Sequence, residues 1–138
     1  MTLEMNDQQF RRLLDLVYIG NWVLNSTRGE DRIREYDEVE SLIFAQCLKK
    51  GMAPLVELYE GELIPSRRFA EGGIHEAIMA YEDAMFFEIL AQDLALRDMN
   101  DVSIDGENYE ELNDRMNEYL GEFALHGTDH VTVELEPE

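Results

Sequence analysis

Apolar residues recur at intervals of three and four along two long segments of the chain, which is the spacing of a helix face. The first predicted helix covers 7–25 and follows Asn6, whose spacing from Gln9 matches a capping box. The second covers 74–99. Each carries apolar residues on two sides, so we expect both helices to be covered from two directions and to pack together at the centre of a bundle. The main stripe of the second helix is Ile74, Ile78, Tyr81, Met85 and Ile89, and the additional stripes are Leu16, Ile19 and Val23 in the first helix and Phe87, Leu90 and Leu94 in the second.

Shorter elements fill the region between the two long helices. A loop over 26–34 leads into a helix that ends at Gly51, because glycine commonly follows the last turn of a helix. Proline is tolerated in a first turn, so a short helix is expected over 54–60. Ser66 then caps a further turn, and the glycine pair 72–73 interrupts the chain before the second long helix.

The last predicted helix, over 107–125, has a single apolar stripe and should lie at the surface. After it, the tail 130–136 alternates apolar and polar residues, which is the period of a strand. One strand cannot form a sheet alone, so the tail is either frayed or paired with another chain, and both a monomer and a homodimer stay open. The predicted fold is an all-α bundle of four to five helices, with a single domain over 1–128 and an extended acidic tail over 129–138.

Acidic residues are concentrated in the second half of the chain. The formal net charge is −20. Residues 1–69 hold 12 acids and nine basic residues, whereas residues 70–138 hold 19 acids and two basic residues. Nucleic-acid affinity depends on lysine and arginine contacts to phosphate, so direct nucleic-acid binding is not expected. Anionic membrane surfaces are disfavoured for the same reason.

Neither a leader nor a membrane span is predicted. The N-terminal residues include Glu4 and Asp7 and lack the basic segment and apolar run of a signal peptide. The most apolar stretch, 13–24, is shorter than the roughly 20 residues that a bilayer-spanning helix requires. The single cysteine, Cys47, excludes an intramolecular disulfide and is expected as a buried thiol. A cytoplasmic location follows from these observations.

Five carboxylates recur at intervals of three and four along the last predicted helix. Like charges at this spacing repel, at a cost of about 0.2–0.5 kcal/mol for each pair, and only Arg115 lies within the helix to offset them. Two interpretations stay open: a solvated face that maintains solubility, or a surface that binds a basic protein partner. The second makes the protein a non-catalytic interaction module. The five residues are Glu107, Glu111, Asp114, Glu118 and Glu122.

The alternative function is a small helical enzyme or a metal-binding protein that uses the long helix over 74–99. His75 and Glu82 are the weak metal-ligand candidates, but their spacing of seven residues is too long for one mononuclear site. Such a site would also need a residue from another helix, such as Glu40 or Asp15. We therefore predict no bound metal. The glycine pair 72–73 lacks the further glycines and lysine of a phosphate loop, so no cofactor is expected either.

A pocket is the other candidate site, and its expected residues are Asn21, Trp22, Glu82 and Glu88. Asn21 lies within an apolar stripe and Glu88 at the edge of one, so both are candidates for partial burial. If Glu88 met Asn21, Tyr18 or Tyr36, its pKa would be raised and it could transfer protons. Aromatic residues at helical spacing are more often core residues, and no residue is assigned a catalytic role.

Two short runs resemble a known family. They are Tyr-Ile-Gly-Asn-Trp at 18–22 and Tyr-Glu-Asp-Ala-Met-Phe-Phe-Glu at 81–88, accompanied by Arg97 and Asp98. These residues are similar to those of a family of small acidic bacterial proteins that carries no assigned function. The resemblance spans about residues 10–99. It implies a bacterial origin and no particular activity.

Overall fold

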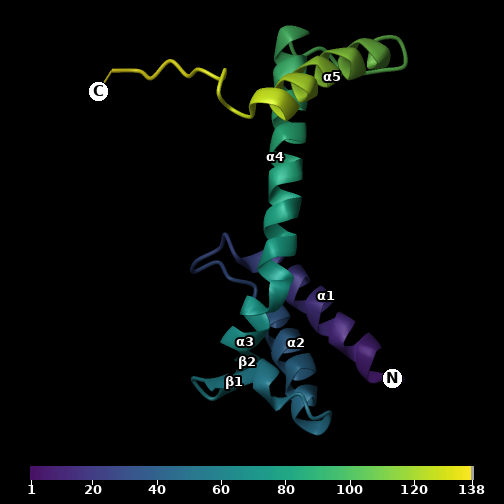
Figure 1. Ribbon diagram of the computed structural model, residues 1–138, viewed down its shortest axis with the longest axis vertical. Coiled ribbons are helices and arrows are strands. Elements are labelled where there is room, and N and C mark those ends of the chain that lie inside the picture. The colour runs from purple at the N-terminus through teal and green to yellow at the C-terminus, as the bar shows by residue number, and fades with distance from the viewer. Residues whose placement is uncertain (138) are drawn as a thin grey trace. The chain divides into compact units, whose positions relative to one another are not determined.

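The computed structural model describes residues 1–137, whose contacts group into two compact units. Unit 1 is Met1–Ile78 and unit 2 is Met79–Glu138. The chain is mostly helical, as predicted, with a small two-stranded sheet that the sequence did not suggest. The sequence predicts a single domain over 1–128, and this stays a prediction because a grouping of contacts does not test it. The four longer helices are α1 (Asp7–Asn25), α2 (Arg34–Ala45), α4 (His75–Asp98) and α5 (Tyr109–His126), labelled in Figure 1.

The first helix begins and ends at the predicted residues. The side chain of Asn6 accepts a hydrogen bond from the backbone N–H of Gln9 at 2.8 Å, and the Gln9 side chain accepts one from the Asn6 N–H at 3.0 Å. This reciprocal capping box satisfies two N–H groups that a helix start otherwise leaves unpaired. The local sequence alone therefore determined where α1 starts.

A β-hairpin replaces the short helix that was expected over 54–60, so that prediction is wrong. Pro54 lies only in a 3₁₀ turn, Ala53–Leu55, and strands β1 (Val56–Tyr59) and β2 (Glu62–Pro65) then pair antiparallel. The two linking residues, Glu60 and Gly61, both have positive φ values of 51° and 82°. Positive φ at both positions is the geometry of a type I′ hairpin turn, whose twist matches that of the strands.

The core of unit 1 forms where α1, α2 and the short helix α3 (Arg67–Phe69) meet. The Phe44 and Phe69 rings pack edge to face, with centroids 4.9 Å apart, and both side chains are fully buried. Cys47 is buried in the same cluster, as expected. Ser66 caps α3, also as expected, by accepting a hydrogen bond from the Phe69 N–H at 3.2 Å.

The glycine pair breaks the helical path between α3 and α4 as predicted. Residues Ala70–Ile74 form a π-helical segment in which Gly73 has φ of 111°. A side chain is strained at that φ, so glycine is the residue that this kink requires.

Unit 2 is built on the contact between α4 and α5. Its core comprises Ala95, Met99 and Leu112, with three half-buried residues packed against them, Leu96, Met116 and Tyr119. The helix α5 is buried along one face only, at Leu112 and Phe123, as its single apolar stripe predicted. The small side chain of Ala95 is fully buried in this core.

Two of the apolar stripes are less covered than expected. Leu16 and Val23 of the additional stripe of α1 are 69% and 67% exposed, and Tyr81 and Ile89 of the main stripe of α4 are 65% and 55% exposed. The additional stripe of α4, formed by Phe87, Leu90 and Leu94, is half-buried. In unit 1, α1 packs against α2, and only the first turn of α4 belongs to that unit. Among the described residues of unit 1, the expected packing of the two long helices is confined to that turn, where His75 contacts Tyr18 and Trp22. Among the described residues after Gly127, no strand is formed.

None of the helices in the described part of the chain combines the length and the apolar character that a bilayer span requires.

Two leucines on α1 provide a matched test of which face is covered. Leu14 is fully buried and Leu16 is 69% exposed. We predict that Leu14→Ala lowers the free energy of unfolding by about 2–5 kcal/mol, because it removes buried methyl groups and leaves a cavity. Leu16→Ala should lower it by less than about 0.5 kcal/mol, as a surface substitution does. Urea unfolding followed by circular dichroism measures both, and equal losses would mean that the second stripe is covered.

Candidate functional site

A pocket of about 360 Å³ in unit 1 contains two of the four predicted pocket residues, Asn21 and Trp22. The other two, Glu82 and Glu88, are exposed residues of α4 in unit 2, and no residue of that unit lines this pocket. Its walls come from α1, the loop that follows it, and α2. The lining residues are Tyr18, Asn21, Trp22, Ser26, Arg32 and Glu40.

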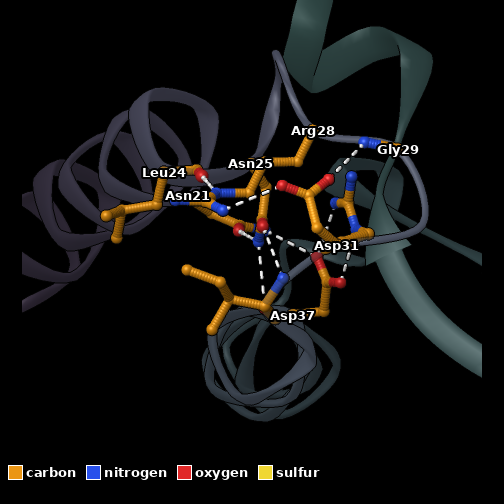
Figure 2. A network of polar contacts seen from close by, with 9 residues as sticks. Asn21, Leu24, Asn25, Arg28, Gly29, Asp31 and Asp37 are labelled. Carbon is orange, nitrogen blue, oxygen red and sulfur yellow. Dashed lines mark hydrogen bonds and ion pairs between the residues drawn. The ribbon is translucent and has the colours of Figure 1, made fainter.

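A buried amide side chain holds the loop between α1 and α2 in place. Asn25 is 1% exposed, and its side-chain oxygen accepts a hydrogen bond from the Ile33 N–H at 2.8 Å. Its amide nitrogen donates to the Ile33 carbonyl at 3.0 Å and to the Asn21 side chain at 2.7 Å. Figure 2 shows these bonds between the end of α1 and the start of α2. Asn25 thus satisfies both backbone polar groups of Ile33, the residue that precedes α2.

An ion pair continues this network across the loop. Asp37 of α2 accepts hydrogen bonds from Arg32 Nε and Nη2, both at 2.6 Å, and from the Asn21 amide at 2.9 Å. The Arg32 hydrogen bonds, followed by that from Asn21, lower the pKa of Asp37, although partial burial opposes them. Asp37 is therefore ionised and occupies the guanidinium of Arg32 in a bidentate pair.

Glu40 lies one turn after Asp37 on α2 and has no salt-bridge partner within the described residues. Burial raises the pKa of Glu40 to about 7; the nearby charge of Asp37 adds to this shift, while Asn21 and Arg32 oppose it. A carboxyl group with this pKa exchanges protons near neutral pH, which is the property required of a general acid or base. Because Asp37 already pairs with Arg32, Glu40 is the proton-exchanging group of the pocket.

Tyr18 and Trp22, which line the pocket, belong to an aromatic cluster that also contains His75. The Tyr18 hydroxyl and His75 Nε2 share a hydrogen bond of 2.6 Å, and the His75 ring packs on Trp22 with centroids 4.8 Å apart. Burial, and then the charge of Glu40, raise the pKa of Tyr18. His75 was a weak metal-ligand candidate together with Glu82. Its Nε2 is occupied by Tyr18, and Glu82 is exposed, so these two residues form no ligand group in the described chain.

Several of these residues are candidates from the sequence, but with other predicted partners. Tyr18 is predicted there as a possible contact of Glu88, and Glu40 as a possible further ligand of a site on the long helix. Two spacings in the sequence agree with part of the observed arrangement. Asn21 and Asn25 lie four residues apart on α1, and Asp37 and Glu40 lie three residues apart on α2. Each pair therefore faces one direction on its helix. No sequence pattern shows that the two faces meet.

The predicted acidic surface lies mainly on α5. Glu111, Asp114 and Glu118 are exposed there, and Glu111 pairs with Arg115 at 3.0 Å. Glu107 is exposed but precedes the helix, in a turn where its N–H donates to Asp105 at 2.8 Å. Glu122 is half-buried. The series is therefore interrupted at both ends, and its three central members form the exposed face.

A hollow of about 300 Å³ adjoins this face within unit 2. The Tyr119 hydroxyl donates a hydrogen bond to Asp98, which also accepts from Arg97 Nη2 at 3.0 Å. The bond to Tyr119, followed by that to Arg97, lowers the pKa of Asp98. The hollow therefore carries three carboxyl groups against a single arginine. Its lining residues are Asp98, Arg115, Glu118, Tyr119 and Glu122.

The sequence matches no family model, no curated protein and no solved structure. The resemblance to small acidic bacterial proteins stays a prediction.

The buried amide of Asn25 makes a stability prediction. Asn25→Ala leaves the N–H and carbonyl of Ile33 without their partner, and each unpaired buried group costs about 1–3 kcal/mol. We expect the free energy of unfolding to fall by about 2–4 kcal/mol in urea unfolding. The control is Gln8→Ala, an exposed position on the same helix, which should change it by less than about 0.5 kcal/mol. Similar values for the two variants would contradict the proposed role of the amide.

The raised pKa of Glu40 makes a prediction about pH. The folded protein binds this proton more tightly than the unfolded chain, so stability is lost as pH rises from the ordinary value of 4.5 to about 7. Glu40→Gln should match the wild type at pH 5 and exceed its free energy of unfolding at pH 8 by about 1–2 kcal/mol, a value reduced for the partial exposure of the carboxyl group. Glu38→Gln, an exposed change of equal charge on α2, should show no such pH-dependent difference. Parallel pH profiles for both variants would overturn the assignment.

Proposed function

We propose that the protein is a non-catalytic, cytoplasmic interaction module that binds a basic protein partner through the acidic face of α5. This face is defined by Glu111, Asp114 and Glu118. The observation that carries the proposal is that all three carboxylates are exposed on one helix while the cations of unit 2 are already paired within it.

The charge balance of unit 2 supports this function. Residues 79–138 contain 17 acidic and two basic residues, the arginines Arg97 and Arg115. Arg97 pairs with Asp98, and Arg115 with Glu111, each at 3.0 Å. Neither arginine is left to neutralise the other carboxylates. Such a surface produces a negative potential that attracts cationic partners and speeds their association.

The hollow beside the acidic face adds a place for a cationic side chain. Carboxylates of Asp98, Glu118 and Glu122 line it together with the ring of Tyr119. A lysine or arginine side chain has an apolar stem and a charged end, and it suits a hollow that offers an aromatic surface and several carboxylates. One such side chain would reduce the local excess of negative charge, which three carboxylates and one arginine produce. The surface thus has both a long-range attraction and a specific contact.

The solubility interpretation makes a different prediction about location. A solvated acidic surface acts through total charge, so a carboxylate on α5 and one elsewhere would be equivalent. A binding surface depends on where the charges lie. The alternative enzyme or metal function on the long helix is less well supported, because Tyr18 occupies His75 Nε2 and Glu82 is exposed.

The test compares two variants of equal net charge. The α5 variant carries Glu111→Gln, Asp114→Asn and Glu118→Gln, and the control carries Glu30→Gln, Glu35→Gln and Glu38→Gln on exposed positions of unit 1. Binding of a labelled lysine-rich peptide is followed by fluorescence anisotropy. We expect the α5 variant to bind at least about tenfold more weakly than the wild type, and the control to stay within about twofold. The wild-type affinity should also fall as salt is raised.

Affinity capture from bacterial lysate uses the same three proteins. The wild type and the control should retain the same basic protein, and the α5 variant should lose it. Equal loss in both variants would show that total charge alone matters, and retention by the α5 variant would show that its face is not the binding surface. Either result overturns the proposed function.

A further inference from the structure

A second cluster of ligand-type side chains lies at the end of α5, apart from the pocket of unit 1. Glu122 and His126 are four residues apart on the helix, so they project from the same face one turn apart. The helix ends at His126, and Gly127 then reverses the chain with φ of 55° and ψ of −128°. This reversal brings His130 back against the last turn. A residue with a Cβ is strained in that conformation, so glycine permits the reversal.

Backbone hydrogen bonds hold the reversed segment in place. The Gly127 N–H donates to the Phe123 carbonyl at 2.8 Å, and the Asp129 N–H donates to the His126 carbonyl at 3.0 Å. The His126 and His130 rings then face each other with centroids 4.3 Å apart. The position of His130 is therefore set by local backbone structure and does not depend on its own side-chain contacts alone.

The three side chains converge on one small volume. One ligand atom from each of Glu122, His126 and His130 lies within 4.8 Å of the others, and His130 Nδ1 is 2.6 Å from Glu122 Oε1. Two ligands of a tetrahedral zinc ion, bound at about 2.0–2.1 Å, stand about 3.3 Å apart. Both histidines are exposed, so rotation about their side-chain bonds can close the remaining difference.

One oxygen of the carboxylate at this cluster has no partner among the described residues. Glu122 Oε2 is buried and has no hydrogen-bond partner, although Oε1 of the same carboxylate is bonded to His130. A buried acceptor without a donor costs free energy that a bound cation would recover. Two imidazoles and one carboxylate are the donor set of borderline divalent transition metals, whereas magnesium and calcium prefer oxygen ligands alone.

We propose that Glu122, His126 and His130 bind one divalent transition-metal ion of the zinc class, with a fourth coordination position open to water or to a partner's side chain. The inference goes beyond the proposed function, since it concerns a different ligand. The three residues are spaced in the sequence as Glu-x-x-x-His-x-x-x-His, outside the long helix over 74–99 that holds the weak metal-ligand candidates. A helix alone would not continue past Gly127, the glycine between the two histidines. The reversal of the chain at Gly127 brings the three side chains together.

Binding of the ion would clip the segment after Gly127 to the end of α5. A ligand that binds only the folded protein stabilises it in proportion to its concentration over its Kd. Zinc should therefore raise the Tm and protect the amides of 127–131 from hydrogen exchange. Magnesium at the same concentration should do neither.

The experiment is titration of the full chain with ZnCl₂ at pH 7.5, followed by calorimetry. We expect one ion per chain, and each of Glu122→Gln, His126→Gln and His130→Gln should weaken binding by at least about 30-fold. Glu118→Gln, one turn earlier on the same helix, and Asp129→Asn, beside His130, are controls that should stay within about threefold. Because His130 is exposed and outside any helix, its variant separates loss of a ligand from loss of folding, which circular dichroism checks.

Cobalt provides a second readout that folding does not mimic. Co²⁺ bound to two imidazoles and one carboxylate should give visible absorption bands of a four- or five-coordinate ion, and zinc should displace it. The absence of stoichiometric uptake, or equal weakening by Glu118→Gln, would overturn the proposal in favour of diffuse binding to the acidic surface. Its failure is distinct from that of the proposed function: the lysine-rich peptide test uses no variant of Glu122, His126 or His130.

Discussion

Unit 1 depends on one buried amide, that of Asn25. Its side chain bonds both backbone polar groups of Ile33, so the end of α1 and the start of α2 are held together. Everything in the pocket follows from this connection. The direction in which α2 starts places Asp37 against Asn21, and one turn later it places Glu40 beside the same asparagine and near Tyr18. A single pair of satisfied backbone groups thus helps to determine which side chains of two helices share a cavity, because a buried N–H or carbonyl that is left unpaired costs about 1–3 kcal/mol.

A shortage of cations shapes the chemistry of both units. The chain has 31 acidic and 11 basic residues, so many carboxylates cannot pair within the protein. In unit 1, Asp37 forms an ion pair with Arg32. Burial favours the uncharged form of Glu40 and raises its pKa to about 7. In unit 2 most carboxylates lie on the surface, where water solvates them. The same excess of acid therefore produces a proton-exchanging group where it is buried and a negative surface where it is exposed.

The hollow beside the acidic face and the histidine cluster share Glu122, which lines the hollow and also bonds His130. A cation at the histidine cluster would neutralise this carboxylate and reduce the negative potential at one end of the face. Glu111, Asp114 and Glu118 would not contact the ion, since they lie one to three turns further toward the start of α5. Metal binding and partner binding are thus separable by residue but coupled through charge, with each expected to weaken the other slightly unless the partner supplies a fourth ligand.

The sequence by itself determined the features that depend on neighbouring residues: the capping box at Asn6 and Gln9, the break at Gly73, and the predominance of helix. The prediction of a helix over 54–60 was wrong. Proline fits the first turn of a helix, but the chain forms a hairpin whose turn has two residues with positive φ. The sequence also overestimated burial of the stripe at Leu16 and Val23, because periodicity shows that a face is apolar but not what covers it. Only the tertiary structure decided which faces meet. Glu40 joins Asn21 and Tyr18 through contacts between two helices, and no local sequence pattern shows that these helix faces meet. His130 returns to Glu122 because the chain reverses at Gly127, which the spacing of the residues does not show by itself.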